Sequence, residues 1–236
     1  MALLEIENLS TGYGEIKVLW GISLKVEEKG VTALLGANGA GKSTLLNCIS
    51  GLHKTWEGRI LLEGRDITGV KPHKRIELGI SMVPEGRRIF PGMTVIENLM
   101  MGAYTKRARE KMEESYEEVY DLFPVLKERQ KQRAGTLSGG EQQMLAIARS
   151  LMARPRLLML DEVSTGLSPV LTTTVMETLA KLAETGLPML MVEQHVEKAL
   201  EISERAYVLE NGRIIMEGES KALSTDEQLK KAYMGI

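Results

Sequence analysis

The segment GANGAGKST at residues 36–44 constrains the fold of this chain more than any other feature. It follows the apolar run VTALL, which is typical of a buried parallel strand, and a helical pattern begins directly after it. Glycines here let backbone N–H groups turn inward around an anion at the positive N-terminal end of the next helix. This strand–loop–helix setting is the one that a phosphate-binding loop of spacing G-x-x-x-x-G-K-[ST] requires. The residues that fit the spacing are Gly36, Gly41, Lys42 and Ser43.

The residue types in this loop fit the triphosphate of ATP. Lys42 is expected to reach the β and γ phosphates, Ser43 to give its hydroxyl to Mg²⁺, and Thr44 to add a phosphate contact. A glycine turn that only starts a helix would need neither the lysine nor the serine. The predicted nucleotide-binding residues of the loop are Gly36, Ala37, Asn38, Gly39, Ala40, Gly41, Lys42, Ser43 and Thr44.

A second buried run, RLLMLDE at residues 156–162, ends in two carboxylates. We expect Asp161 to hold Mg²⁺ through water, because this metal needs an anionic ligand beside the phosphates. Glu162 is suited to orient and deprotonate the water that attacks the γ-phosphate, a general-base role worth about 10² to 10⁴ in rate. An Asp-Glu pair alone also fits a turn at a strand end, but together with the phosphate loop it predicts nucleotide hydrolysis.

Strand and helix patterns alternate along the chain on both sides of a helical segment. The alternation predicts an α/β fold built around the phosphate-binding loop. Strands are predicted at residues 3–9, 18–26 with an interruption at Gly21, 31–35, 59–62, 80–83, 157–160, 189–192, 206–210 and 213–216, and helices at 42–50, 72–78, 170–184 and 196–202.

Strand patterns are missing between residues 94 and 153, where helical periodicity takes over. We therefore predict one domain over residues 1–236, with an α/β core at 1–88 and 155–236 and a helical subdomain at 89–154. The alternating charges of residues 106–118 indicate a solvated helix face with i,i+4 pairs rather than a binding site.

Composition excludes several classes of protein. Lys plus Arg total 30 against 32 for Asp plus Glu, so a formal charge of -2 gives no general attraction to nucleic acid. Apolar runs stay far below the roughly 20 residues that span a bilayer, and the N-terminus lacks a basic signal-peptide region, so a cytoplasmic chain is expected. The single cysteine, Cys48, excludes an internal disulfide and a cysteine metal cage, and its apolar neighbours suggest a core position.

LSGGEQQ at residues 137–143 resembles the signature motif of ABC ATPases. It opens a helix before the strand that carries Asp161, and it offers a second glycine-bearing helix N-terminus able to hold an anion. The resemblance implies that Ser138, Gly139 and Gly140 of one copy close over the γ-phosphate held by another. Two ATP molecules would then be sandwiched in a head-to-tail dimer.

Other elements of the family follow in the same order along nearly the whole chain, so the resemblance implies an α/β fold: a P-loop NTPase (RecA-like) core with an N-terminal antiparallel β subdomain and an inserted α-helical subdomain. Tyr13, in TGYG, stands where the family has an aromatic residue that stacks on adenine; a lone tyrosine would otherwise be a core or surface residue. MVPEG at residues 82–86 corresponds to the Q-loop, the hinge to the helical insert, with Glu85 in place of glutamine. Glu85 can meet the metal or its water but cannot donate a hydrogen bond.

The chain departs from the family in two more loops. After Glu162, Val163 stands where proline is usual and Ser168 where aspartate is usual. In MVEQH, Gln194 occupies the place of the family's switch histidine, while His195 lies one residue later. Because a one-residue shift at a strand end turns a side chain to the opposite face, Gln194 is favoured as the γ-phosphate sensor over His195.

Four further segments are VPEGRRIFPGMTVIENLMMGAY, DEVSTGLSP, VEQ and the closing KKAYMG. Together they resemble the LivF-type ATP-binding subunits of branched-chain amino acid importers. That family implies two ATPase subunits, identical or different, on membrane-spanning permeases at the inner face of the membrane, with a separate substrate-binding protein. Related importers of urea, amides or other amino acids, and soluble non-transport ABC ATPases, are the alternatives. Residues 86–91, with Arg87, Arg88 and Phe90, are the predicted permease contact; otherwise they form an ordinary loop.

Overall fold

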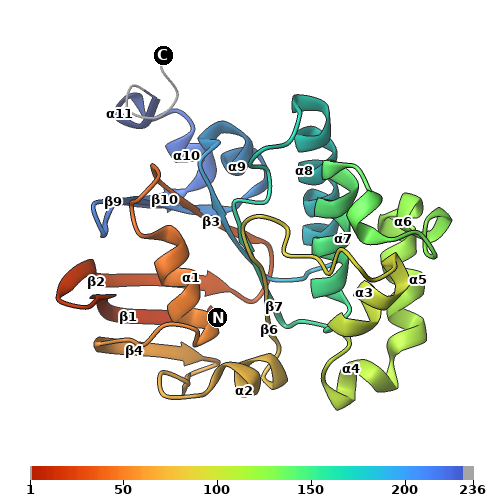
Figure 1. Cartoon of the computed structure of the whole chain (residues 1–236). Coiled ribbons are helices and arrows are strands. Elements are labelled where there is room, and N and C mark those ends of the chain that lie inside the picture. Colours follow the sequence, from red (N-terminus) through yellow and green to blue (C-terminus); the bar gives the residue numbers. More distant parts are fainter. Residues whose placement is uncertain (1, 231–236) are drawn as a thin grey trace.

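Two β-sheets organise the chain in the computed structural model, which describes residues 2–230 (Figure 1). The predicted ending KKAYMG therefore lies almost wholly outside the described residues. The smaller sheet is antiparallel, in the order β2-β1-β4-β5. One of its faces is buried, as the alternation of buried and exposed residues along β2 indicates. Its strands are β1 (Ala2–Tyr13), β2 (Ile16–Glu27), β4 (Glu57–Leu62) and β5 (Arg65–Asp66).

The predicted interruption at Gly21 is a β-bulge rather than a break between strands. The pairing of β1 with β2 shifts register between Leu9 and Thr11, opposite this glycine. Gly21 adopts a φ of 62°, and its N–H donates to Ser10 Oγ at 3.0 Å. Glycine tolerates this left-handed conformation, so β2 bends and continues.

The larger sheet follows the order β10-β9-β3-β8-β7-β6, and β3, β8 and β7 lie at its centre. All its pairs are parallel except β9 with β10. Because carboxyl ends of parallel strands meet at one edge, the segments after β3, β7 and β8 converge there. The strands are β3 (Val31–Leu35), β6 (Ile80–Val83), β7 (Leu157–Asp161), β8 (Met189–Glu193), β9 (Arg205–Glu210) and β10 (Arg213–Glu219).

A hydrophobic core lies on each face of this larger sheet. Leu35 of β3 packs into the core shared with α7 to α9, whereas Leu34 packs into the core shared with α1 and the smaller sheet. Cys48 of α1 is buried in that second core, as expected, and burial raises the pKa of its thiol to about 11. The helices flanking the sheets are α1 (Lys42–Ser50), α2 (Pro72–Glu77), α8 (Pro169–Glu184), α9 (Val196–Ile202), α10 (Ser220–Leu223) and α11 (Glu227–Leu229).

Helices follow one another between β6 and β7, on the right in Figure 1. The predicted α/β fold with an antiparallel sheet and a helical insert is thus confirmed. The charged run divides at Lys111 into two helices, and its exposed ion pairs include Lys106 with Glu110 at 3.8 Å. Within residues 2–230, no helix is both long and apolar enough to cross a membrane. The insert contains α3 (Val95–Gly102), α4 (Lys106–Glu110), α5 (Met112–Leu122), α6 (Pro124–Glu128), a short 3₁₀ turn (Ala134–Thr136) and α7 (Gly139–Leu151).

Candidate active site

The glycine loop between β3 and α1 forms a cradle for an anion. Gly41 caps α1 with a φ of 109°, and a Cβ atom there would lie 2.5 Å from a methyl carbon of Leu19, so only glycine fits. No side chain caps this end of α1, which leaves its first N–H groups facing the loop. Gly39, at a φ of 81°, supplies a second left-handed turn. Such a helix start suits a phosphate group.

Lys42 is the cation of this cradle, and its side chain is only 3% exposed. Its ammonium group donates to the carbonyl oxygens of Gly36 at 2.8 Å and Ala37 at 2.9 Å. It also lies 3.0 Å from Glu162 Oε1. These three contacts use the three donors that a lysine ammonium has.

Ser43 and Asp161 meet at the edge of the sheet, although they lie far apart in sequence. Ser43 Oγ donates to Asp161 Oδ1 at 3.0 Å. Burial raises the pKa of Asp161 to about 6, with repulsion from Glu162 and Glu85 adding to the rise and the Ser43 hydrogen bond and Lys42 opposing it. One hydroxyl and one carboxylate fit Mg²⁺, which is usually held by one or two carboxylates together with phosphate oxygens and water.

Glu162 occupies a strained backbone position directly after β7. Its φ is 48°, a region that costs a non-glycine residue energy and that clusters at functional sites. Its N–H donates to the carbonyl of Val192 at 2.9 Å. Its Oε2 accepts from Gln194 Nε2 at 2.5 Å and from Thr165 Oγ1 at 3.4 Å. The carboxylate is thereby fixed toward the phosphate loop.

Gln194 and His195 point in different directions. Gln194 Nε2 bonds both Glu162 and, at 2.5 Å, Asn38 Oδ1 of the phosphate loop. His195 is exposed and stands at the N-cap position of α9, outside this network. The structure thus brings Gln194, and not His195, to the predicted site.

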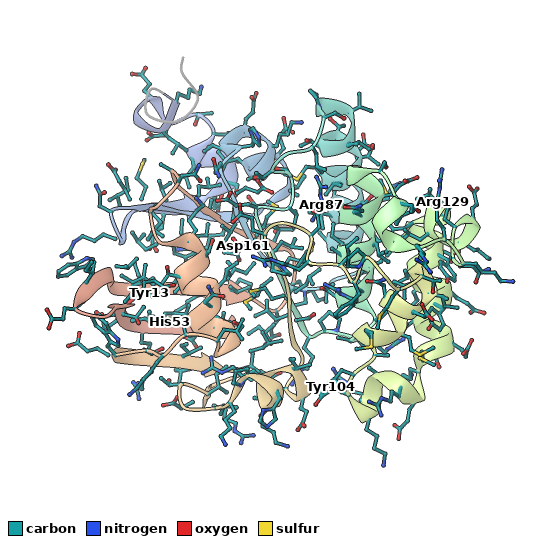
Figure 2. The ribbon with its side chains drawn as sticks, in the orientation of Figure 1. Tyr13, His53, Arg87, Tyr104, Arg129 and Asp161 are labelled. Carbon is teal, nitrogen blue, oxygen red and sulfur yellow. The ribbon has the colours of Figure 1, made fainter. Side chains whose placement is uncertain are left out.

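Tyr13 ends β1 beside the first turn of α1. Its hydroxyl lies 3.5 Å from Thr44 Oγ1, and its ring is 51% exposed. Behind it stands His53, with ring centroids 4.4 Å apart, held by a 2.9 Å hydrogen bond between Nε2 and the carbonyl of Gly12 (Figure 2). Sequence reasoning missed His53, because nothing in the loop after α1 points to it.

The segment after β6 adopts an unusual backbone. Gly86, Arg87 and Arg88 have φ values of 77°, 67° and 45°, three left-handed residues in a row. Glu85 before them is exposed, and its charge contributes to the raised pKa of Asp161. The Arg87 guanidinium reaches Gln142 Oε1 of α7 at 3.5 Å, so this segment contacts the start of α7.

The start of α7 carries the predicted signature residues. Ser138 forms a capping box with Glu141: Ser138 N–H donates to Glu141 Oε2 at 2.8 Å, and Ser138 Oγ accepts from Glu141 N–H. A Cβ atom at Gly139 would lie 3.0 Å from the Arg87 guanidinium, so the backbone is closely approached there. Within residues 2–230, no hydrogen bond or ion pair joins residues 138–140 to the phosphate loop, and one chain does not unite the two motifs.

Two further side chains belong to the loop after Glu162. Ser168 caps α8, its Oγ accepting from Leu171 N–H at 3.4 Å. Ser164 is buried and bonds the carboxylate of Glu193, which ends β8 and is 0% exposed. Sequence reasoning missed Glu193, although a charged residue closing the apolar run MLMV was a visible signal.

Known proteins with similar sequences and structures are ATP-binding proteins of transport systems, and the similarity extends over nearly the whole chain. The profile of the ABC transporter family matches residues 19–165, more than half of the chain. The chain is 44% identical over 233 residues to the high-affinity branched-chain amino acid transport ATP-binding protein BraG of Pseudomonas aeruginosa, covering 99% of this chain and 100% of the relative. It is 40% identical over 235 residues to the probable branched-chain amino acid transport ATP-binding protein LivF of Archaeoglobus fulgidus, covering 99% of each. Among solved structures, the ADP conformation of MJ1267, an ATP-binding cassette of an ABC transporter, is similar with a TM-score of 0.85 at 32% identity, covering 100% of both chains.

Proposed function

Because the chain belongs to the ABC transporter family, whose ATP-binding subunits are ATPases coupled to transport, we propose that it powers import of branched-chain amino acids. The observation that carries this proposal is the similarity to BraG and LivF, which covers 99% of this chain in each case. The family alone supports ATP hydrolysis. The transported class rests on the two relatives named for branched-chain amino acids.

Hydrolysis in this proposal begins with the cradle at the start of α1. Its free N–H groups and Lys42 hold the phosphates, and Ser43 and Asp161 hold the metal. Mg²⁺, when bound there, neutralises charge that develops on the phosphate oxygens. Glu162 accepts a proton from the attacking water, and Gln194 orients that water and the carboxylate. Tyr13 stacks on the adenine ring.

Lys42 has to change partners for this site to work. Its three donors serve two loop carbonyls and Glu162. Phosphate oxygens compete for the same donors, because they carry more charge than the carbonyls. The exchange frees Glu162 for water, so nucleotide binding itself prepares the base.

A second copy or a related subunit completes the site. Ser138, Gly139 and Gly140 lie on α7, with no hydrogen bond or ion pair to residues 36–44 in the described chain. They are proposed to close on the γ-phosphate held by the partner, where the N-terminus of α7 attracts the anion. Glu85, whose charge contributes to the raised pKa of Asp161, is proposed to meet the metal or its water.

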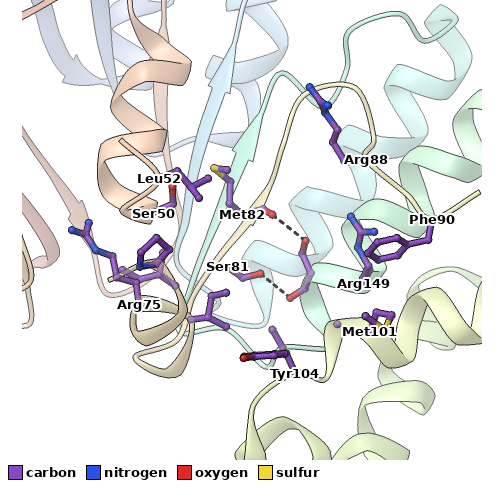
Figure 3. A pocket seen from close by; sticks show the side chains of 16 residues that line it. Ser50, Leu52, Arg75, Ser81, Met82, Arg88, Phe90, Met101, Tyr104 and Arg149 are labelled. Carbon is purple, nitrogen blue, oxygen red and sulfur yellow. Dashed lines mark hydrogen bonds between the residues drawn. The ribbon is translucent and has the colours of Figure 1, made fainter. Parts of the chain in front are cut away.

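The proposed permease contact includes the predicted segment 86–91 and the groove that Arg88 and Phe90 of this segment line, between the core and the helical subdomain, residues 89–154. The groove encloses about 350 Å³ between α1, α2 and β6 on one side and α3 and α7 on the other (Figure 3). None of the 16 side chains drawn around it is acidic. The exposed apolar residues that line it are Leu52, Ile76, Phe90, Met101 and Tyr104.

Arg149 makes this groove favourable for a partner that brings a hydrogen-bond acceptor. The guanidinium stacks over Phe90 at 5.1 Å from the ring centroid, and its Nη1 is buried without a hydrogen-bond partner in the described residues. Burial lowers the pKa of Arg149. A buried unpaired donor is costly, so a partner carboxylate or helix C-terminal carbonyl would be favoured there. The proposed occupant is a permease helix with an apolar face and such an acceptor, at the inner face of the membrane.

Reconstitution tests the transported class directly. The chain, its paired ATPase subunit and the permeases would be placed in liposomes, and ATP turnover measured with a binding protein loaded with leucine, isoleucine or valine. We expect these ligands to stimulate turnover several-fold. Stimulation by urea or amides and not by the three amino acids would overturn the substrate class and leave the ATPase assignment intact.

A further inference from the structure

A carboxylate is fully buried next to the hydrolysis site and has no role in the steps above. Glu193 is 0% exposed at the end of β8. Its Oε1 accepts from Ser164 N–H at 3.1 Å, and its Oε2 accepts from Ser164 Oγ at 2.7 Å. Ser164 is itself 2% exposed and lies in the loop after Glu162. Both oxygens of the carboxylate are therefore used by one residue.

These contacts close a ring through the site. Glu162 leads along the chain to Ser164, which bonds Glu193; the next residue, Gln194, bonds back to Glu162 at 2.5 Å. The Glu162 N–H also donates to Val192 at 2.9 Å, which joins the same two segments once more. Turning either Glu162 or Gln194 would break a link in this ring.

The position of Glu193 is costly for the folded chain. Within residues 2–230 no ion pair neutralises it, and burial raises its pKa, while the two bonds from Ser164 and, more weakly, the nearby His195 oppose the rise. The neighbouring Glu162 charge adds to the rise. An apolar residue would avoid this cost, because a buried carboxylate without a cation is unfavourable. The two hydrogen bonds from Ser164 explain why a carboxylate stands at this position instead of an apolar side chain.

We propose that Glu193 is a positioning residue that sets the directions of Glu162 and Gln194 together, by anchoring the loop after β7 to the end of β8. The strained φ of 48° at Glu162 needs such support from its surroundings. The inference rests on the proposed role of Glu162 as general base. Glu193 touches neither nucleotide nor water in this account and acts only through its two neighbours.

Glu193→Ala and Glu193→Gln separate positioning from charge. The amide of glutamine can accept from Ser164 N–H and donate to Ser164 Oγ, so it restores both bonds without the charge. We expect Glu193→Ala to lower kcat about 10- to 100-fold with KM for ATP changed less than about twofold, and Glu193→Gln to recover kcat to within about threefold of wild type. Ser164→Ala, which removes one bond, should lower kcat about threefold to tenfold and serves if Glu193→Ala fails to fold.

Ser203→Ala is the matched control. Ser203 and Ser220 are both buried, and their hydroxyl oxygens share a 2.7 Å hydrogen bond. Neither residue belongs to the proposed site. This variant should lose thermal stability and keep kcat. Unchanged kcat in Glu193→Ala, equal losses in the alanine and glutamine variants, or an equal kcat loss in Ser203→Ala would each overturn the inference.

A double variant connects the effect to Glu162. Adding Glu193→Ala to Glu162→Gln should lower turnover by a smaller factor than Glu193→Ala does in the wild-type chain, because Glu162, one of the two groups to be positioned, is already replaced. A further full loss would overturn the inference while leaving the base role of Glu162 in place. Turnover that survives Glu162→Gln would instead remove the base role, and positioning of that base with it.

Discussion

Lys42 Nζ and Glu162 Oε1 lie 3.0 Å apart, and the two side chains are 3% and 7% exposed. The cation that should bind phosphate and the carboxylate that should activate water thus neutralise each other. Pairing lets both charges be buried, since an isolated buried charge is strongly unfavourable. Because phosphate would compete with Glu162 for Lys42, nucleotide binding and the release of Glu162 as a base are expected to be linked.

The first prediction concerns the base. Glu162→Gln keeps the shape of the side chain and removes proton acceptance, so ATP turnover should fall at least about 100-fold. With Mg²⁺ present, ATP should then trap a stable dimer that sizing chromatography detects. Turnover near wild type, with no dimer at any ATP concentration, would contradict both the base and the shared site.

A second prediction follows from the buried pair. Lys42→Ala leaves the Glu162 carboxylate without its cation and should lower the free energy of unfolding by about 3 kcal/mol in the absence of nucleotide. Lys42→Ala combined with Glu162→Gln should regain at least about half of that loss, because no buried charge remains. Denaturant unfolding of the four proteins measures the cycle, and equal losses in the single and double variants would argue against the pair.

The third prediction separates two neighbouring residues. Gln194→Ala removes the bonds to Glu162 and Asn38 and should lower kcat about 10-fold or more. His195→Ala, at an exposed helix start, should stay within about twofold of wild type. Steady-state ATPase kinetics decide between them, and the reverse ranking would identify His195 as the functional residue.

The fourth prediction concerns the support of the Tyr13 ring, which is proposed to stack on adenine. His53→Ala removes the ring that lies 4.4 Å from Tyr13, and aromatic pairs of this kind contribute about 0.5 to 1.5 kcal/mol. We expect KM for ATP to rise about twofold to tenfold with kcat unchanged, and Tyr13→Ala to have a larger effect in the same direction. A fall in kcat at unchanged KM would show that His53 acts elsewhere.

The fifth prediction tests the permease groove. Arg149→Glu places a negative charge where the groove has an unpaired donor, so co-purification with the permeases should fall about 10-fold or more. ATP turnover of the isolated chain should change little. Lys106→Glu, on the exposed face of α4, is the matched charge change and should leave co-purification intact; equal losses would mean that net charge, and not this groove, governs the contact.

Local sequence patterns predicted most of the helices and strands. They did not predict features that depend on contacts between residues far apart in the sequence. GANGAGKST specifies its own loop, because the glycines and the helix start are adjacent in sequence. The bulge at Gly21, the break at Lys111 and the two-residue β5 depend on pairing or packing with distant residues, so periodicity alone did not show them.

The same division holds for the site. Gln194 was favoured over His195 because it matches the place of the family's switch histidine, and a shift of one residue at a strand end reverses the direction of a side chain. The bond between Ser164, in the loop after β7, and Glu193, at the end of β8, joins residues 29 positions apart, and it exists only once β7 and β8 are paired. His53 behind Tyr13 has the same origin, since the loop after α1 has to fold back onto β1.

The buried thiol of Cys48 makes this chain convenient for chemical labelling. It is the single cysteine, it is 0% exposed, and its pKa of about 11 leaves almost no thiolate at neutral pH. Alkylating reagents should therefore not react with Cys48 in the folded chain, and should modify it only when α1 separates from the smaller sheet. A cysteine introduced on the surface should therefore be the one that a thiol-reactive probe labels, even with Cys48 still in place.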